Sequence, residues 1–218
     1  MTQPAKLVST LITDFELQVN DVTELSSSEE LSLLNRINQS ICAKRPWEFL
    51  KTSASGTMSG SGVDGYYITI PSDFGYFYDN NTYTDNTISA QNNASPKVIF
   101  IGTNRTPYQI VNYSDRVQYL GKTGYAYVDL GNSKICFTGT PISTTYLMDY
   151  IKIPALLTTS DYPPFNGRFH DILVFGMAVD NEILQLSPKA ESYAPENQAK
   201  FNQYLSDMEY HYSQFINN

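Results

Sequence analysis

The chain has 218 residues, of which 41% are hydrophobic and only 17% are charged, and its net charge is −8. Its length and apolar content allow one large domain, or a domain with an insertion, around a real core. Tight phosphate binding needs clustered Lys and Arg, so the acidic balance argues against a conventional nucleic-acid reader. No apolar run approaches the roughly 20 residues of a membrane-spanning helix, and we expect no membrane partner.

Two amphipathic helices are predicted in the first quarter of the chain. Over residues 5–19 apolar residues recur every four positions, which is the spacing of one helix face. In the next segment Ser27 and Glu30 have the spacing of a capping box. A stripe follows at Leu31, Leu34, Ile37 and Ile41. Because the residue before a proline is biased away from the helical conformation, Pro46 ends this second helix.

The single tryptophan follows this helix directly, in the stretch "CAKRPWEFL". Trp47, Phe49 and Leu50 place a large apolar area just behind the helix end. We predict that these three residues form a core seam where the chain leaves the helices. A role of Trp47 in stacking against a ligand is the alternative.

The middle of the chain changes to β-structure. Residues 51–65 are rich in Ser and Gly and are predicted to be a connector or the lead-in to a wide hairpin. From Tyr66 to Tyr150 the apolar pattern alternates, as in "YYITIPSDF", "KVIFIG", "YAYVDLG", "SKICFTG" and "TYLMDYIKI". Turn sequences separate these runs, which predicts an antiparallel sandwich or barrel-like unit. The Asn- and Thr-rich stretch 79–95 is predicted to be an exposed loop.

Two more helices are predicted after the prolines at 163–164. The first is apolar nearly all round and should be central. Its Asp180 faces the apolar side of the helix and is expected to be buried, and a buried acid needs a cationic partner, for which Arg36 and Arg168 are the candidates. The last helix, from Glu196 to about Ile216, has Tyr210 on one side and a stripe on the other. The stripe consists of Phe201, Tyr204, Leu205, Met208, Tyr212 and Phe215.

These elements together predict an α+β fold. Because helices at both ends of the chain must bury their apolar faces against each other, residues 1–50 and 160–218 should form one bundle. Residues 51–159 then form an inserted β domain.

Residues that perform catalysis or bind metals are scarce. His170, beside Asp171 on the central helix, is predicted to be a hydrogen-bonded histidine of the bundle. Metal-ligand spacings such as Cys-x-x-Cys are absent, as is a Gly-x-Ser-x-Gly nucleophile motif. We therefore predict no catalytic, cofactor-binding or metal-binding residues. Cys42 and Cys136 are expected to be buried thiols in a reducing cytoplasm.

The order of the elements resembles that of a known protein family. The sequence runs from "NRINQSICAKRPWEFL" through "YYITIPSDF" and "YLMDYIKIPALLTT" to "PPFNGRFHDILVFGMA" and a Tyr-rich terminal helix. This order resembles the head-to-tail adaptor proteins of tailed bacteriophages, most closely the ring connector proteins of short-tailed phages. Nearly the whole chain takes part in the resemblance.

The resemblance implies a structural virion protein in the phage neck, assembled in the host cytoplasm. It implies a homo-oligomeric ring, usually of twelve copies, between the portal protein and the tail nozzle or the next ring protein. Genome DNA would pass through the ring without specific binding. Family adaptors use their C-terminal segment against the portal, so the resemblance assigns five residues to a portal or subunit interface: Phe201, Tyr204, Tyr210, Tyr212 and Phe215. Whether Tyr210 contacts the portal or a neighbouring subunit is left open.

A different class of function is a carbohydrate- or receptor-binding tail component. Tyr-rich surfaces suit such a role, but a lectin would normally be all-β, whereas helices are predicted for nearly half of this chain. The sequence therefore favours the adaptor.

Overall fold

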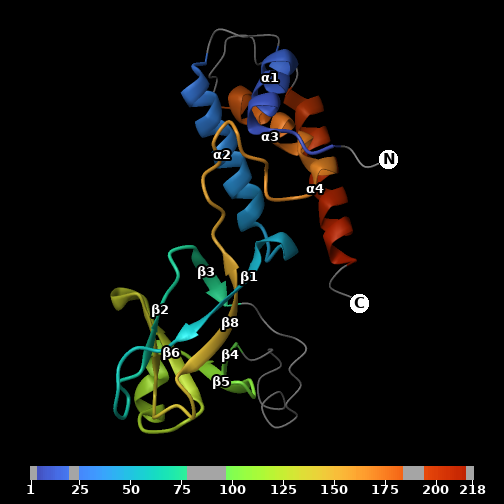
Figure 1. Ribbon diagram of the computed structural model, residues 1–218. Coiled ribbons are helices and arrows are strands. Elements are labelled where there is room, and N and C mark those ends of the chain that lie inside the picture. The colour runs from blue at the N-terminus through green and yellow to red at the C-terminus, as the bar shows by residue number, and fades with distance from the viewer. Residues whose placement is uncertain (1–3, 20–24, 78–96, 184–193, 215–218) are drawn as a thin grey trace. The chain divides into compact units, whose positions relative to one another are not determined.

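The structure is a computed structural model that describes residues 4–19, 25–77, 97–183 and 194–214. The chain forms two compact units, which we name the helical unit (Met1–Leu50 and Pro154–Asn218) and the β unit (Lys51–Ile153). Helices and strands are thus segregated along the chain (Figure 1). The predicted α+β fold class is confirmed.

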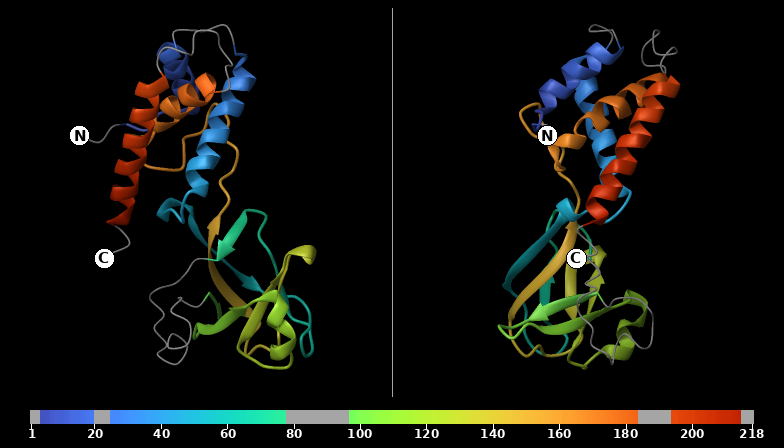
Figure 2. Two further views of the ribbon diagram at one scale, coloured as in Figure 1. Left: turned by 180° about the vertical axis from the view of Figure 1, so that it is seen from behind. Right: turned by 90° about the vertical axis from the view of Figure 1, so that its right-hand side faces the viewer.

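The helical unit is organised around its third helix. Its elements are α1 (Val8–Val19), α2 (Ser27–Ala43), α3 (Asp171–Ile183) and α4 (Ala194–Ser213), with short 3-10 turns η1 (Glu48–Leu50) and η4 (Gly167–Phe169). α3 contacts each of the other three helices, and the views in Figure 2 show it lying among them. Its Ile172, Leu173, Met177 and Ala178 are fully buried. The prediction of a central helix is therefore confirmed.

Gly176 is the point where two helices approach α3 most closely. A Cβ at this position would lie 2.5 Å from Ile37 Cγ2 and 3.0 Å from Phe201 Cε2. Both neighbours are side chains, of α2 and α4, so a methyl group here must displace Ile37 and press against the ring of Phe201.

We expect Gly176→Ala to destabilise the helical unit by about 1–3 kcal/mol, the usual cost of overpacking. The intrinsic helix preference of Ala, about 1 kcal/mol over Gly, offsets this only in part. Chemical denaturation followed by circular dichroism measures the change. Gly131→Ala is the control, because a Cβ there meets only Asp129 Oδ1 at 3.5 Å. Equal stability of the two variants would contradict the close approach.

The N-terminus of α2 differs from the prediction by one residue. Ser26, not Ser27, is the N-cap, and its partner in the capping box is Glu29. Ser26 N donates to Glu29 Oε2 at 2.8 Å, and Glu29 N donates to Ser26 Oγ at 3.4 Å. Glu30 is only 3% exposed, so its carboxylate is not free to fold back over the helix end. The sequence contains two overlapping Ser-x-x-Glu patterns, Ser26–Glu29 and Ser27–Glu30. Because Glu30 is buried, only the first forms the capping box.

The start of α1 is fixed by residues far away in the sequence. The helix begins at Val8 rather than at residue 5. Val8 N donates to the carbonyl of Asp161, and Ser9 N donates to that of Thr159, each at 3.0 Å. The turn at 158–161 thus satisfies amides that a helix terminus leaves without partners.

The β unit is an eight-stranded sheet that is nearly closed into a barrel. Its strands are β1 (Lys51–Thr57), β2 (Tyr67–Thr69), β3 (Phe74–Phe77), β4 (Val98–Ile101), β5 (Thr106–Val111), β6 (Tyr125–Asp129), β7 (Lys134–Phe137) and β8 (Thr145–Lys152). The order is β1-β8-β4-β5-β6-β7-β2, with β3 also paired to β8. The expectation of a purely antiparallel sheet is wrong at one pair, because β5 and β6 run parallel. The crossover that this requires includes the 3-10 turn η2 (Tyr113–Tyr119).

The interior of the β unit is one apolar cluster. Its fully enclosed members include Ile99, Ile101, Ala126, Phe137 and Met148. Three strands were not among the predicted runs, and one of them, β3, shares only Phe74 with the run "YYITIPSDF". β1 falls in the segment that was predicted as a connector or hairpin lead-in. β5 comes after the turn that follows β4, between two predicted runs. The predicted loop 79–95 lies outside the described residues.

Candidate interaction surface

Groups for metal chemistry do not gather in the described part of the chain. No three His, Cys, Asp or Glu side chains lie close enough there to hold a metal ion. No described helix is long and apolar enough to cross a bilayer. Cys42 and Cys136 are free thiols, as predicted, but only Cys42 is buried, and Cys136 is partly exposed. Burial raises the pKa of Cys42 to about 12. Cys42 is therefore a neutral core residue and no nucleophile.

The Trp47 cluster lies in the core of the helical unit. Trp47 is 1% exposed, and its ring centroid lies 5.7 Å from those of both Phe49 and Tyr212. Its Nε1–H donates to the carbonyl of Ile41 at 2.7 Å. Because Ile41 is in the last turn of α2, the indole also satisfies a helix-terminal carbonyl. Leu50 is 1% exposed, and Phe49 also contacts Phe165. These contacts all lie within the helical unit, so a sealing role toward the β unit stays a prediction.

The C-terminal helix separates the predicted interface residues into two groups. Phe201 lies against Gly176, and Tyr204 packs on Phe175 with ring centroids 5.6 Å apart. Tyr212 is 9% exposed, and its hydroxyl accepts a hydrogen bond from Asn166 N at 3.0 Å. These three side chains therefore serve the helical unit of their own chain.

Tyr210 is different, because 71% of its surface is exposed. It follows Glu209 near the end of α4 and points away from the buried face that holds Met208 and Tyr212. Large aromatic side chains are typical anchors of protein interfaces. Tyr210 is thus the candidate contact residue on this helix. Phe215 lies outside the described residues.

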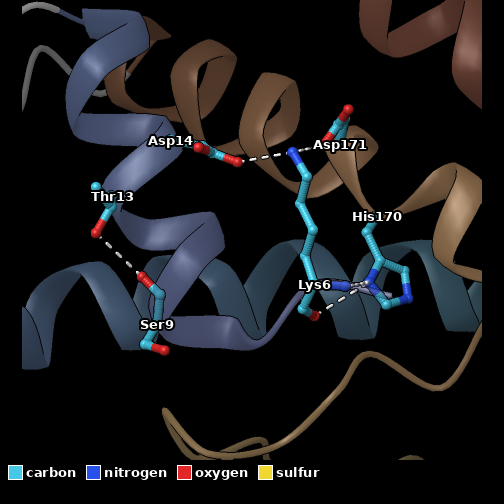
Figure 3. A network of polar contacts seen from close by, with 6 residues as sticks. All are labelled: Lys6, Ser9, Thr13, Asp14, His170 and Asp171. Carbon is cyan, nitrogen blue, oxygen red and sulfur yellow. Dashed lines mark hydrogen bonds and ion pairs between the residues drawn. The ribbon is translucent and has the colours of Figure 1, made fainter. Parts of the chain in front are cut away.

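A polar network fastens the N-terminal segment to α3 (Figure 3). The main-chain N–H of Lys6 donates to His170 Nδ1 at 3.0 Å, and His170 Nε2 lies 2.9 Å from the carbonyl oxygen of Phe165. The Lys6 side chain extends between two carboxylates, with Nζ 2.8 Å from Asp14 and 2.7 Å from Asp171. Burial alone would lower the pKa of Lys6, but the hydrogen bonds to both carboxylates raise it overall.

These partners also decide the role of His170. Nε2 faces the Phe165 carbonyl and donates its proton to it. Nδ1 lies 3.0 Å from the main-chain nitrogen of Lys6 and 3.2 Å from the Lys6 carbonyl oxygen, and acceptance from the nearer N–H corresponds to a neutral ring. His170 is 1% exposed, and this burial lowers its pKa. The prediction of a hydrogen-bonded bundle histidine is confirmed.

Asp180 forms an ion pair with Arg36, one of its two predicted partners. Its Oδ2 lies 2.9 Å from both Nε and Nη2 of Arg36, a two-point contact between α3 and α2. The pair is partly exposed, so the expectation of a buried acid is wrong. Exposed ion pairs contribute little to stability, and the pair serves mainly to orient the two helices.

Asn35 is a structural residue that the sequence analysis missed. Its side-chain amide accepts from Leu157 N at 2.7 Å and donates to the Leu157 carbonyl at 2.9 Å. The side chain of Asn35 thus makes the same pair of hydrogen bonds to the main chain of Leu157 that a residue of a neighbouring strand would make. No sequence signal identifies such a contact, because the partner is main chain 122 residues away.

Charge is distributed unevenly between the two units. Residues 51–153 contain seven Lys or Arg, seven Asp and no Glu, so the β unit is neutral and the remaining chain carries the net charge of −8. The β unit also holds 12 of the 17 Tyr. One unit is therefore acidic and the other is neutral. Tyr76 and Tyr113 of the β unit are exposed, and exposed tyrosines suit protein contact.

The loops at one end of the β unit expose aliphatic side chains. Val63, Leu120 and Ile142 are 68%, 47% and 63% exposed. Hydrogen bonds fix these loops to one another: Gly121 N donates to Asp64 Oδ1 at 3.0 Å, and Thr123 Oγ1 donates to the Thr140 carbonyl at 3.1 Å. This end is a second candidate contact surface.

Comparison with known families and proteins adds one finding. The family model described as SU10 adaptor protein matches residues 7–215, which is nearly the whole chain. No curated protein matches. The family match favours the adaptor over the carbohydrate- or receptor-binding alternative.

Proposed function

Because the chain belongs to the SU10 adaptor protein family, and is thereby a structural adaptor protein of a bacteriophage, we propose that its copies form a ring between the portal and the tail. The family match over residues 7–215 is the observation that carries this proposal. The ring extends the DNA exit channel and presents a platform to the next tail protein. Its assembly takes place in the host cytoplasm before the tail is added.

The division into two units supports this role. The acidic helical unit disfavours adhesion to the genome backbone, because like charges repel. The neutral β unit offers tyrosines and exposed aliphatic loops to protein partners. Twelve copies are the number that the resemblance to ring connectors implies.

Tyr210 is the residue through which we propose that α4 contacts the portal. Deletion of residues 209–218 is not a clean test of this contact. Such a deletion removes Tyr212, which packs on Trp47 and Phe49. A point substitution at the exposed Tyr210 avoids this damage.

We expect Tyr210→Ser to weaken attachment to portal-bearing heads by about thirty-fold, the equivalent of losing a roughly 2 kcal/mol interface anchor. Co-sedimentation of the purified protein with heads measures attachment, and native mass spectrometry measures ring formation. Tyr162→Ser is the matched control, since Tyr162 is 55% exposed in the same unit but lies outside α4. Loss of rings rather than of head attachment would assign Tyr210 to the neighbouring subunit. Normal attachment of the variant would move the portal contact elsewhere.

We also expect the isolated protein to have negligible affinity for duplex DNA at physiological salt. Binding of phosphates is driven by counterion release from clustered cations, whereas this chain has 14 Lys and Arg against 22 Asp and Glu. Fluorescence anisotropy with a labelled duplex measures the affinity. A dissociation constant near micromolar would contradict passive passage of the genome.

A further inference from the structure

The outer edge of β1 presents a row of main-chain groups without a strand partner among the described residues. Met58 N donates to the Thr144 carbonyl, so the even-numbered residues of β1 face β8 in the antiparallel ladder. The odd-numbered residues Ser53, Ser55 and Thr57 then direct their N–H and C=O groups away from β8.

A ladder on this outer edge begins and then stops. Ser59 and Tyr67 exchange both main-chain hydrogen bonds, each at 2.9 Å. Beyond this bridge no described strand continues the pairing toward Thr57, Ser55 and Ser53. β1 and β2 are therefore the two ends of the sheet order, joined only at this bridge (Figure 1). The pair Ser59–Tyr67 thus shows that main-chain groups on this edge can form antiparallel hydrogen bonds.

The edge lacks the features by which proteins prevent strand addition. Exposed edge strands usually carry charged residues, Pro or a bulge. The only charged residue of β1 is Lys51, at its first position. The other six residues, "TSASGT", have no charge and no Pro, and the pairing with β8 runs without a register shift over all seven residues. A regular edge that is uncharged over six residues is a template for another strand.

The inner face of the same edge is made of small residues. Ala54 and Gly56 lie on the side of β1 that faces the core, as does the buried Met58. A Cβ at Gly56 would lie 3.2 Å from the hydroxyl oxygen of Tyr146, so the ring of this partly buried residue lies directly against the glycine. An added strand would place alternate side chains beside these small residues and next to the apolar cluster.

We infer that the outer edge of β1 accepts an extended segment of a different virion polypeptide, with apolar side chains at alternate positions. This mode of recognition takes affinity from main-chain hydrogen bonds and specificity from alternate side chains. The described strands of this chain are already paired, and the other end of the sheet, β2, is three residues long. A second copy could offer only the same β1 edge, and contact between two identical edges is two-fold, whereas neighbouring subunits of the proposed ring meet through different surfaces. The partner's place in the virion rests on the proposed function.

Hydrogen exchange in purified tailed particles, compared with the purified protein, tests the inference. We expect the amides of Ser53, Ser55 and Thr57 to exchange fast in the purified protein and at least ten-fold more slowly in particles. Slow exchange in the dilute purified protein would mean that the chain covers its own edge, and protection that appears only at high protein concentration would mean a second copy. Either result overturns the inference. Unchanged fast exchange in particles also overturns it, but leaves the proposed function intact. Absence of the protein from particles overturns both.

Variants at Ser55 separate edge pairing from folding. Ser55→Pro removes an N–H that faces away from β8, and Pro is tolerated on edge strands, whereas Ser55→Ala keeps the amide. We expect particles assembled with Ser55→Pro to lose the protection and to fall at least ten-fold in yield, with Ser55→Ala unaffected. If thermal melts show that Ser55→Pro is unfolded, Ser55→Lys introduces a charged edge residue instead. Normal yield and protection with a folded Pro or Lys variant would overturn the inference.

Discussion

Replacing Trp47 by Ala should lower the free energy of unfolding of the helical unit by about 3–5 kcal/mol, the usual range for truncating a buried large aromatic residue. The side chain is 1% exposed and contacts Phe49 and Tyr212. Truncation leaves a cavity in this cluster and removes the donor to the Ile41 carbonyl. The substitution therefore combines the cost of a cavity with the cost of a lost hydrogen bond.

A second variant separates the two costs. Trp47→Phe keeps an aromatic ring but lacks the N–H, so we expect it to retain part of the packing and to lose about 1 kcal/mol for the hydrogen bond. Urea denaturation followed by far-UV circular dichroism is the measurement, because the variants lack the only tryptophan. Leu17→Ala is the control, since Leu17 lies in the same unit and is 71% exposed. If Trp47→Ala unfolds at the wild-type urea concentration, the residue acts at a surface contact instead.

The sequence predicted the helices better than their ends. Apolar residues at helical spacing identified α1, α2, α3 and α4, because burial of one stripe is a local property of the sequence. The ends depend on partners far away in the chain. α1 begins where Asp161 and Thr159 accept its first amides, and the N-cap of α2 moves to Ser26 because Glu30 is buried.

The strands that escaped prediction lack an alternating apolar pattern. β1 reads Lys-Thr-Ser-Ala-Ser-Gly-Thr, and it is a strand because it pairs with β8 along its whole length. β5 includes Pro107, which normally argues against a strand. Pairing between distant segments overrides these local preferences. The same reasoning explains why the free edge of β1 was not foreseen.

Residue types identified the interface candidates only in part. Six aromatic or apolar residues of the predicted last helix were placed on one stripe, but a stripe alone does not distinguish a partner helix in the same chain from another protein. Phe201, Tyr204 and Tyr212 prove to contact their own helical unit. Tyr210 stays a candidate because it falls off that stripe and is exposed.

Removal of the His170 side chain should also be costly. His170→Ala leaves the Lys6 N–H and the Phe165 carbonyl without their side-chain partner, in a place where the imidazole is 1% exposed. We expect a loss of about 2–4 kcal/mol, since each buried polar group left without a partner costs roughly 1–3 kcal/mol. Urea denaturation at pH 7.5 measures this loss.

The same residue should make stability depend on pH. Burial lowers the pKa of His170 in the folded protein, so the unfolded chain, with a His pKa of about 6.5, binds the proton more readily. The stability that neutral His170 contributes is complete above about pH 6.5. It is then lost as the pH falls through the lower folded pKa, when protonated Nδ1 can no longer accept from Lys6 N. The charged groups nearest to the imidazole are Lys6, Asp14 and Asp171, which are joined to one another by ion pairs.

Two other groups titrate nearby and set the design of the experiment. Burial, followed by Arg168, lowers the pKa of His211, which gives a slope of the same sign. Burial, followed by Glu16, raises the pKa of Glu30, so its contribution is present at low pH and is lost as the pH rises through its folded pKa. The contribution of His170 is therefore the difference between wild type and His170→Gln, with His211→Gln as the matched control. We expect unfolding free energies between pH 7.5 and 5 to fall less steeply for His170→Gln than for wild type or His211→Gln. Parallel curves for all three proteins would show that His170 does not fasten the N-terminal segment through its neutral ring.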